Sequence, residues 1–320
     1  MNLFTMLITR PMGFIIELIY SLVRNYGLAL ILFTVLIKLI LVPLTVKSQK
    51  SMKKQQKLQP AIAELQKKYA NDKEKLNVEM MKLYKENNVG MMSGCLPMLI
   101  QMPILIGLYQ VIQKPLSYML GVDFNMAESI NRVLDIQGRM ASQFPDVIGK
   151  LAQSPMKDLA NMYQIQISKW SEMLFGQGDP WVINFHFFGM DLSNVPTAAL
   201  NSLVRGDFSN IGVLALLAIP VIAILTTWLV SKLSQPKKNT NADSSEDMSG
   251  QMMKGMNLMM PVMTGFFTFT LPSGLGLYWI ISNVVQLVQQ IILNRHFDRK
   301  EDEIDVKIPE KPRKKRKKRK

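Results

Sequence analysis

Cysteine and histidine are scarce in this chain. Its 320 residues include one cysteine, Cys95, and two histidines, His186 and His296. One cysteine excludes an intrachain disulfide framework and any multi-cysteine metal site, and the two distant histidines lack the spacing of metal ligands. We therefore expect neither a metal nor a cofactor, and we expect both histidines to be structural or exposed to solvent.

Sequence motifs for nucleotide or redox chemistry are also missing. There is no G-x-x-x-x-G-K-[ST] loop and no Cys/His cluster. An enzyme therefore has little support, and we expect that the protein is not one. The net charge of +14 does not by itself indicate a DNA partner, because the basic residues lie in polar stretches between almost uncharged apolar runs.

Acidic residues are absent from the longest apolar runs. About 20 helical residues, rising 1.5 Å each, cross a hydrocarbon core of roughly 30 Å. The sequence thus predicts an all-α, polytopic membrane protein with a bundle of five transmembrane helices. The expected spans are 26–47, 94–119, 211–233, 257–271 and 274–294. Proline and glycine between the last two predict a tight helical turn.

Lysine and arginine are unevenly distributed between the segments that flank these runs. They number 11 in segment 47–93, 4 in 232–256 and 13 in 295–320, but 6 in the long segment 119–210, which has nine acidic residues. The positive-inside rule places the first three segments in the cytoplasm and the fourth outside. The N-terminus is then outside and the C-terminus is cytoplasmic, as an odd number of spans requires.

The segment that precedes the first span, 1–25, is interrupted by Arg10 and Pro11. It is typical of an N-terminal interfacial amphipathic helix, which lies on the membrane surface. An ordinary helical lead-in to the first span is equally compatible with the pattern.

The segment 48–93 has apolar residues at helical spacing in two runs separated by a turn, such as Leu58 and Ile62 in the first and Leu83 and Tyr84 in the second. This pattern predicts a cytoplasmic coiled-coil hairpin. The hairpin is either a spacer or a lever that recruits partners.

Three further segments separate or follow the spans. We expect an extracytoplasmic loop at 120–210, a cytoplasmic loop at 234–256 and a basic cytoplasmic tail at 295–320. The tail is too charged to fold alone. Three functions remain open for the tail: binding to anionic lipid, binding to ribosomal RNA, or only setting the membrane topology. Charge alone favours binding to lipid first.

Lys38 is the only charged residue in the middle of the first span. A lysine inside a membrane costs about 2.5–3.5 kcal/mol on insertion scales, and such residues usually face protein or water. None of the five spans contains an acidic residue to neutralise it. The charge must therefore be hydrated, extend to the membrane surface, or be held by hydroxyl, amide and carbonyl groups. Hydration would imply a water-filled cavity in the cytoplasmic half of the bundle, which is our hypothesis.

Polar residues at three- and four-residue spacing form stripes on the predicted spans. Two interpretations remain open for them, since hydroxyl and amide groups line polar cavities but also hold membrane helices together. The candidate groove residues are Lys38, Thr34, Gln101, Thr227, Trp279, Asn283 and Gln286.

Three stretches together carry a resemblance to a known family. They are KLQPAIAELQKKYANDKEKLNVEMMKLYKENNV, then GCLPMLIQMPILIGLYQVI, and LPSGLGLYWIISNVVQLVQQIIL followed by the basic tail. The chain resembles the YidC family of membrane-protein insertases, which has relatives in mitochondria and chloroplasts. The outer loop is similar only around WVINFHFFGMDLS. The form is closer to Gram-positive members, without the large periplasmic domain.

The resemblance implies a multi-pass protein of the bacterial cell membrane that inserts and helps fold other membrane proteins. Its polar groove would open to the cytoplasm and to lipid, and it would act alone or with the Sec translocon. Nascent membrane proteins, the translocon, the ribosome and anionic lipids are the implied partners. Lys38 stands where relatives usually have arginine, which keeps the charge but loses the planar fork. Trp279 matches a tryptophan of the family's last span. A solute or anion transporter that uses Lys38 is the alternative.

Overall fold

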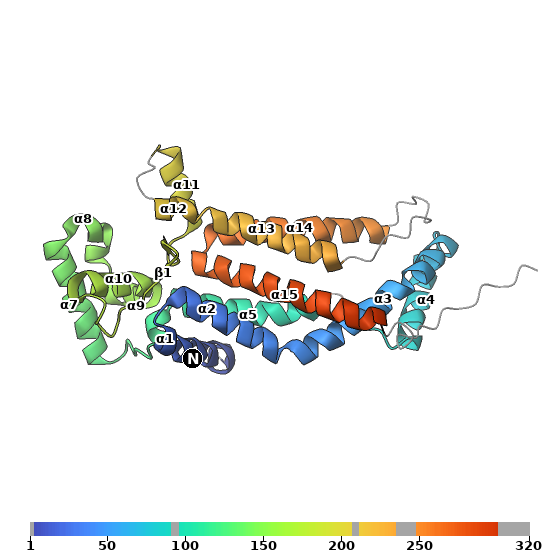
Figure 1. Ribbon diagram of the computed structural model, residues 1–320, viewed down its shortest axis with the longest axis horizontal. Coiled ribbons are helices and arrows are strands. Elements are labelled where there is room, and N and C mark those ends of the chain that lie inside the picture. Colours follow the sequence, from blue (N-terminus) through green and yellow to red (C-terminus); the bar gives the residue numbers. More distant parts are fainter. Residues whose placement is uncertain (1–2, 91–95, 207–210, 235–247, 300–320) are drawn as a thin grey trace, which may run out of the picture. The chain divides into compact units, whose positions relative to one another are not determined.

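The computed structural model describes residues 3–90, 96–206, 211–234 and 248–299. Cys95, loop residues 235–247 and tail residues 300–320 lie outside the described residues, as do the expectations for them. Within the described ranges the chain is mostly helical, with one two-stranded antiparallel ribbon (Figure 1). The ribbon corrects the expectation of a strictly all-α fold.

The chain divides into two compact units, which are described separately. The first comprises Met1–Ile40, Ile100–Leu233 and Asn257–Val288. The second comprises Leu41–Leu99, Ser234–Met256 and Gln289–Lys320.

The first unit begins with a helical pair at the N-terminus. A π-helical turn (Thr5–Thr9) leads into α1 (Arg10–Val23), and α2 (Tyr26–Ile40) follows after two residues. Met12 and Ile16 of α1 are buried, as are Leu30 and Phe33 of α2. These side chains belong to the large apolar core of the unit.

The helix that starts at Tyr26 ends at Ile40, and α3 (Val42–Lys68) begins two residues later. Pro43 explains this break, because its ring clashes with the carbonyl group four residues earlier and it has no N–H to donate. The break falls inside the predicted first span, 26–47. Thr45 therefore lies on a different helix from Lys38.

The second unit contains the predicted cytoplasmic hairpin, which corresponds to α3 and α4 (Lys73–Glu86). Asp72 caps α4 by accepting a hydrogen bond from the Lys75 backbone N–H at 3.0 Å. Leu58 and Ile62 of α3 and Leu83 and Tyr84 of α4 form a small core of their own.

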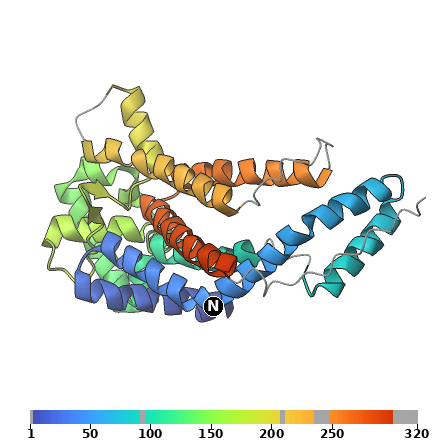
Figure 2. The same ribbon diagram turned by 45° about the vertical axis from the view of Figure 1, so that its right-hand side comes forward.

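The remaining long helices are α5 (Leu96–Gln113), α13 (Ala218–Ser234), α14 (Met248–Thr270) and α15 (Ser273–Arg299). Figures 1 and 2 show α13 alongside α14 and α15. Pro272 separates α14 from α15, as the sequence predicts. Pro103 and Pro261 are accommodated inside α5 and α14.

The segment between α5 and α13 is folded rather than an open loop. Short helices alternate with turns around one ribbon, and Val133, Ile136, Met140 and Trp170 are buried in the core of the first unit. The elements are α6 (Pro115–Tyr118), α7 (Ala127–Gln143), α8 (Pro145–Ile148), a 3-10 turn (Gly149–Gln153), α9 (Met156–Met162), α10 (Gln164–Phe175), β1 (His186–Phe187), β2 (Met190–Asp191), α11 (Pro196–Val204) and α12 (Ile211–Ala215).

Length and apolar composition identify two described helices that could cross a membrane, Thr5–Val23 and Ser273–His296. The broken pair α2 and α3 would be a third if counted as one span, and Leu99–Gln113 and Ala218–Ser234 are shorter apolar helices. This finding differs from the prediction in two ways. It includes the N-terminal segment, for which the sequence suggests an interfacial helix, and it identifies fewer than five spans.

Candidate functional site

A chain of polar contacts starts at Lys38 and joins three helices of the first unit. The Lys38 Nζ of α2 donates to the Oε1 of Gln101 on α5 at 3.4 Å. The Nε2 of Gln101 in turn donates to the Tyr278 hydroxyl on α15. Lys38 and Gln101 are half-buried, whereas Tyr278 is buried. The ammonium group thus faces a neutral amide within an apolar set of helices.

Sequence reasoning does not select Tyr278 for this chain of contacts. Its ring belongs to the apolar pattern LGLYWII, which is equally typical of a core aromatic residue. Ser282, one helical turn further on, also hydrogen-bonds the Tyr278 hydroxyl. The four-residue spacing of these two hydroxyls is the signal that could have identified them.

A second polar cluster lies where α13, α14 and α15 meet. The Asn283 Nδ2 donates to the Thr226 Oγ1 at 3.1 Å and to the Thr227 Oγ1 at 2.8 Å. The Thr227 hydroxyl lies 3.5 Å from that of Thr264. Asn283, Thr227 and Thr264 are all buried. This arrangement is the one expected of polar groups that hold membrane helices together.

The other three candidates lie outside both clusters of contacts. The buried Thr34 hydroxyl donates to the Leu30 carbonyl of its own helix at 2.6 Å. The Trp279 ring stacks on Phe267, with 6.5 Å between the ring centroids. Gln286 is half-buried.

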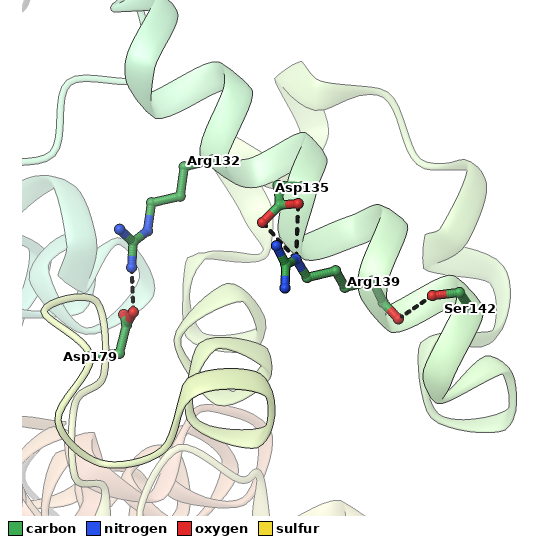
Figure 3. Close-up of polar contacts among 5 residues, drawn as sticks. All are labelled: Arg132, Asp135, Arg139, Ser142 and Asp179. Atoms are coloured by element: carbon green, nitrogen blue, oxygen red, sulfur yellow. Dashed lines mark hydrogen bonds and ion pairs between the residues drawn. The ribbon is translucent and has the colours of Figure 1, made fainter.

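Three ion pairs form between charged residues of the segment that separates α5 from α13. Arg132 of α7 forms an ion pair with Asp179, and its guanidinium lies 4.8 Å from the centre of the Trp181 ring. Arg139 binds Asp135 one turn before it through both carboxylate oxygens, at 2.9 Å each (Figure 3). These contacts stabilise α7 and its attachment to the loop after α10.

A third ion pair joins α10 to the ribbon. The Lys169 Nζ lies 2.7 Å from a carboxylate oxygen of Asp191. Burial raises the pKa of this carboxyl, but hydrogen bonds from Lys169 and Ser193 and the lysine charge outweigh burial. The pKa of Asp191 therefore lies below its ordinary value of 3.8. The pair borders a cavity of about 210 Å³ lined by Lys169, Glu172, Met173, Phe185, His186 and Asp191.

No metal-binding cluster is found in the part of the chain that the structure describes. There, no three His, Cys, Asp or Glu side chains are grouped as ligands of one ion would be. His186 is exposed and contributes backbone contacts, since its carbonyl accepts a hydrogen bond from the Asn25 Nδ2 at 2.8 Å.

Comparison with known proteins identifies the family. The profile of the family described as 60Kd inner membrane protein matches residues 18–301. The membrane protein insertase YidC of Clostridium perfringens is 33% identical over 289 residues, which are 90% of this chain and 87% of that protein. The chain belongs to the YidC family of membrane protein insertases.

Two other relatives differ in how much of their own length the match covers. The insertase YidC of Caldanaerobacter subterraneus is 28% identical over 284 residues, covering 89% of this chain and 92% of that protein. The one from Treponema denticola is 33% identical over 286 residues, which are 89% of this chain but 37% of that protein. Family membership confirms the expected multi-pass membrane protein and the expectation that it is not an enzyme.

Proposed function

We propose that this chain inserts and helps fold nascent membrane proteins by receiving their polar ends beside Lys38. The observation that carries the proposal is the contact between the Lys38 ammonium and the Gln101 amide within apolar helices. A charge in such surroundings usually faces protein or water and indicates a polar path. The family assignment supports the class of substrate.

The proposed topology follows the charge distribution. Five spans at 26–47, 94–119, 211–233, 257–271 and 274–294 place the N-terminus outside and the C-terminus in the cytoplasm of a bacterial cell. The hairpin at 48–93 and the basic tail would then face the ribosome, the Sec translocon and anionic lipid headgroups. The insertase would work alone or beside the translocon.

Transfer of the substrate's apolar helix into lipid drives insertion, because each buried CH₂ group contributes about 0.8 kcal/mol. The membrane potential adds about 2.3 kcal/mol per charge per 100 mV for an acidic segment that moves outward. Lys38 attracts the acidic end and holds water near it, so that the polar end crosses a shorter apolar distance. No covalent step is required of Lys38.

Reconstitution into liposomes with a small acidic single-span substrate tests the role of Lys38. Lys38→Arg should retain insertion, whereas Lys38→Ala should slow it roughly tenfold, the loss expected for a charge-assisted contact of about 1.5 kcal/mol. Lys38→Glu should slow it further by repulsion. Lys47→Ala, which removes an exposed lysine of α3, is the matched control. Equal rates in all variants would refute the role of the charge.

The same liposomes distinguish an anion transporter from an insertase. A transporter that uses Lys38 would carry small anions at a rate that falls in Lys38→Ala without any protein substrate. We expect no flux that depends on Lys38, and a positive result would favour the transporter.

A further inference from the structure

The turn between β1 and β2 exposes a large aromatic side chain in a backbone conformation that does not suit it. Two residues form the turn, Phe188 with φ of 47° and Gly189 with φ of 76°. Positive φ at both positions defines a type I′ hairpin, which favours asparagine, aspartate or glycine at the first position. Phe188 is nevertheless 86% exposed. Backbone preference does not explain this residue, and its ring contact with the neighbouring Phe187 leaves most of its side chain exposed.

The ribbon is attached to the first turn of α2. The Tyr26 N–H donates to the Asn184 carbonyl at 3.0 Å, and the Asn25 Nδ2 donates to that of His186 at 2.8 Å. Phe187 packs so closely that a Cβ at Gly27 would lie 2.5 Å from its ring. The ring centroids of Phe187 and Phe188 are 4.6 Å apart. Phe188 therefore lies close to the N-terminal end of α2, where the apolar residues of that helix begin.

Two more residues, Leu22 and Arg24, lie just before Asn25 in the sequence and are also exposed. Leu22, one turn before Asn25, is 79% exposed. Arg24 ends α1 with φ of 51°. Among the described residues, the Arg24 guanidinium has no hydrogen-bond or ion-pair partner. This combination is typical of residues at the boundary of a lipid bilayer. Apolar side chains there contact the acyl chains, and an arginine binds the lipid phosphate groups.

We propose that the β1–β2 turn is a lipid anchor, in which Phe188 enters the outer leaflet at the boundary between headgroups and acyl chains. Leu22 enters beside it, and Arg24 binds a lipid phosphate. The lipid environment removes the cost of exposing Phe188 to water. The anchor goes beyond the insertase activity and rests only on α2 crossing the membrane with Tyr26 at the outer side.

Spin labels report where Phe188 lies. The full chain carrying Cys95→Ser receives one label at a time, through Phe188→Cys, Leu28→Cys or Val147→Cys, and is placed in liposomes of phosphatidylethanolamine and phosphatidylglycerol. Leu28 is an exposed residue of α2, and Val147 is an exposed residue of α8. Accessibility to oxygen, which enters lipid, is then compared with accessibility to a polar nickel complex.

The label at position 188 should resemble the label at 28, with accessibility to nickel several-fold lower than at 147 and high accessibility to oxygen. Accessibility to nickel equal to that at 147 would place the turn in water and overturn the proposal. Low accessibility to both reagents would reveal a protein contact, such as a second copy of the chain, and would also overturn it. Water access at position 28 would instead refute the proposed first span.

A second pair of variants measures what the ring gains from lipid. Phe188→Asn suits the turn, and Phe188→Trp keeps an aromatic ring that favours membrane boundaries. In liposomes, the asparagine variant should unfold about 2–4 °C below the parent, while the tryptophan variant should match it. An equal or higher Tm for the asparagine variant would overturn the anchor.

Discussion

The two polar clusters of the first unit use similar residues in different surroundings. The contacts of Lys38, Gln101 and Tyr278 join α2, α5 and α15, include a charge, and involve two half-buried side chains. The contacts of Asn283 and Thr227 join α13, α14 and α15, are all neutral, and involve buried side chains except that of Thr226, which is half-buried. The sequence pattern alone treats them as one groove. Their surroundings instead suggest a site that receives polar substrate in one case and a helix junction in the other.

The energies expected of the two clusters support this distinction. Hydrogen bonds between membrane helices average about 0.6 kcal/mol and reach about 1.7 kcal/mol, which is useful for stability. A lysine inside the membrane costs more than such bonds return. Stability alone therefore does not account for Lys38, whereas the proposed substrate with a polar or acidic end would give it a role.

Beyond Lys38 itself, Gln101→Leu should produce the largest effect on activity, because it removes the contacts of Gln101 with Lys38 and with Tyr278. We expect the rate of insertion into liposomes to fall roughly tenfold, by about 1.5 kcal/mol. Gln113→Leu, on the same helix but outside the cluster, should stay within about 0.5 kcal/mol of the parent. Equal rates in the two variants would remove the contrast between the clusters.

Asn283→Ala should act on stability instead. It leaves the hydroxyls of Thr226 and Thr227 without their shared donor, so the free energy of unfolding in detergent should fall by about 1–2 kcal/mol. Insertion per folded molecule should not change. Thr270→Val is the control, because that exposed hydroxyl donates to the Phe266 and Phe267 carbonyls of its own helix. Reduced insertion with unchanged stability would place Asn283 with Lys38.

The ion pair of Lys169 with Asp191 provides a third case for comparison, in which a lysine contacts a carboxylate rather than an amide. Because the pKa of Asp191 is depressed in the folded protein, its contribution is present above the ordinary value of 3.8 and is lost as pH falls below it. Asp191→Asn should lower the free energy of unfolding by about 1 kcal/mol at pH 7 and by less near pH 3, where the contribution of the charged carboxylate is already falling. Denaturant unfolding at the two pH values measures the difference. A loss of equal size at both would mean that the charge of Asp191 is not responsible.

Thr34→Val should have the smallest effect, within about 0.5 kcal/mol in stability and without a change in insertion. The hydroxyl already bonds the Leu30 carbonyl, and valine has nearly the same shape. The insertion assay measures this variant beside Gln101→Leu. A marked loss would show that Thr34 contributes to the polar path, as its position on the sequence stripe suggests.

The local elements could be predicted because they depend on near neighbours. Leu58 and Ile62 pack on Leu83 and Tyr84 because helical spacing places them on one face of each helix. Pro43 is also a readable signal, and it ends the first helix before the predicted boundary at 47. A prediction based only on the length of the apolar run does not take the effect of this proline into account.

Contacts between distant segments could not be predicted. Tyr278 meets Gln101 across 177 residues, and Arg132 meets Asp179 across 47. A tyrosine in an apolar helix gives no sign of which partner its hydroxyl takes. The ribbon of four residues is also too short for an alternating pattern to reveal it.

The contacts of residues 184–194 with the N-terminal helices can form only late in synthesis of the chain. The hydrogen-bond partners of Tyr20 and Asn25 lie 164 and 161 residues later in the chain. At about 5–20 residues per second, roughly 8–30 s of translation pass before those partners exist. The first residues of α15 then donate to the carbonyls of Leu192 and Asn194, both at 2.9 Å. The end of the first unit that contains the ribbon is therefore joined late, and a ribosome that stalls before residue 184 leaves these polar groups of Tyr20 and Asn25 without their partners.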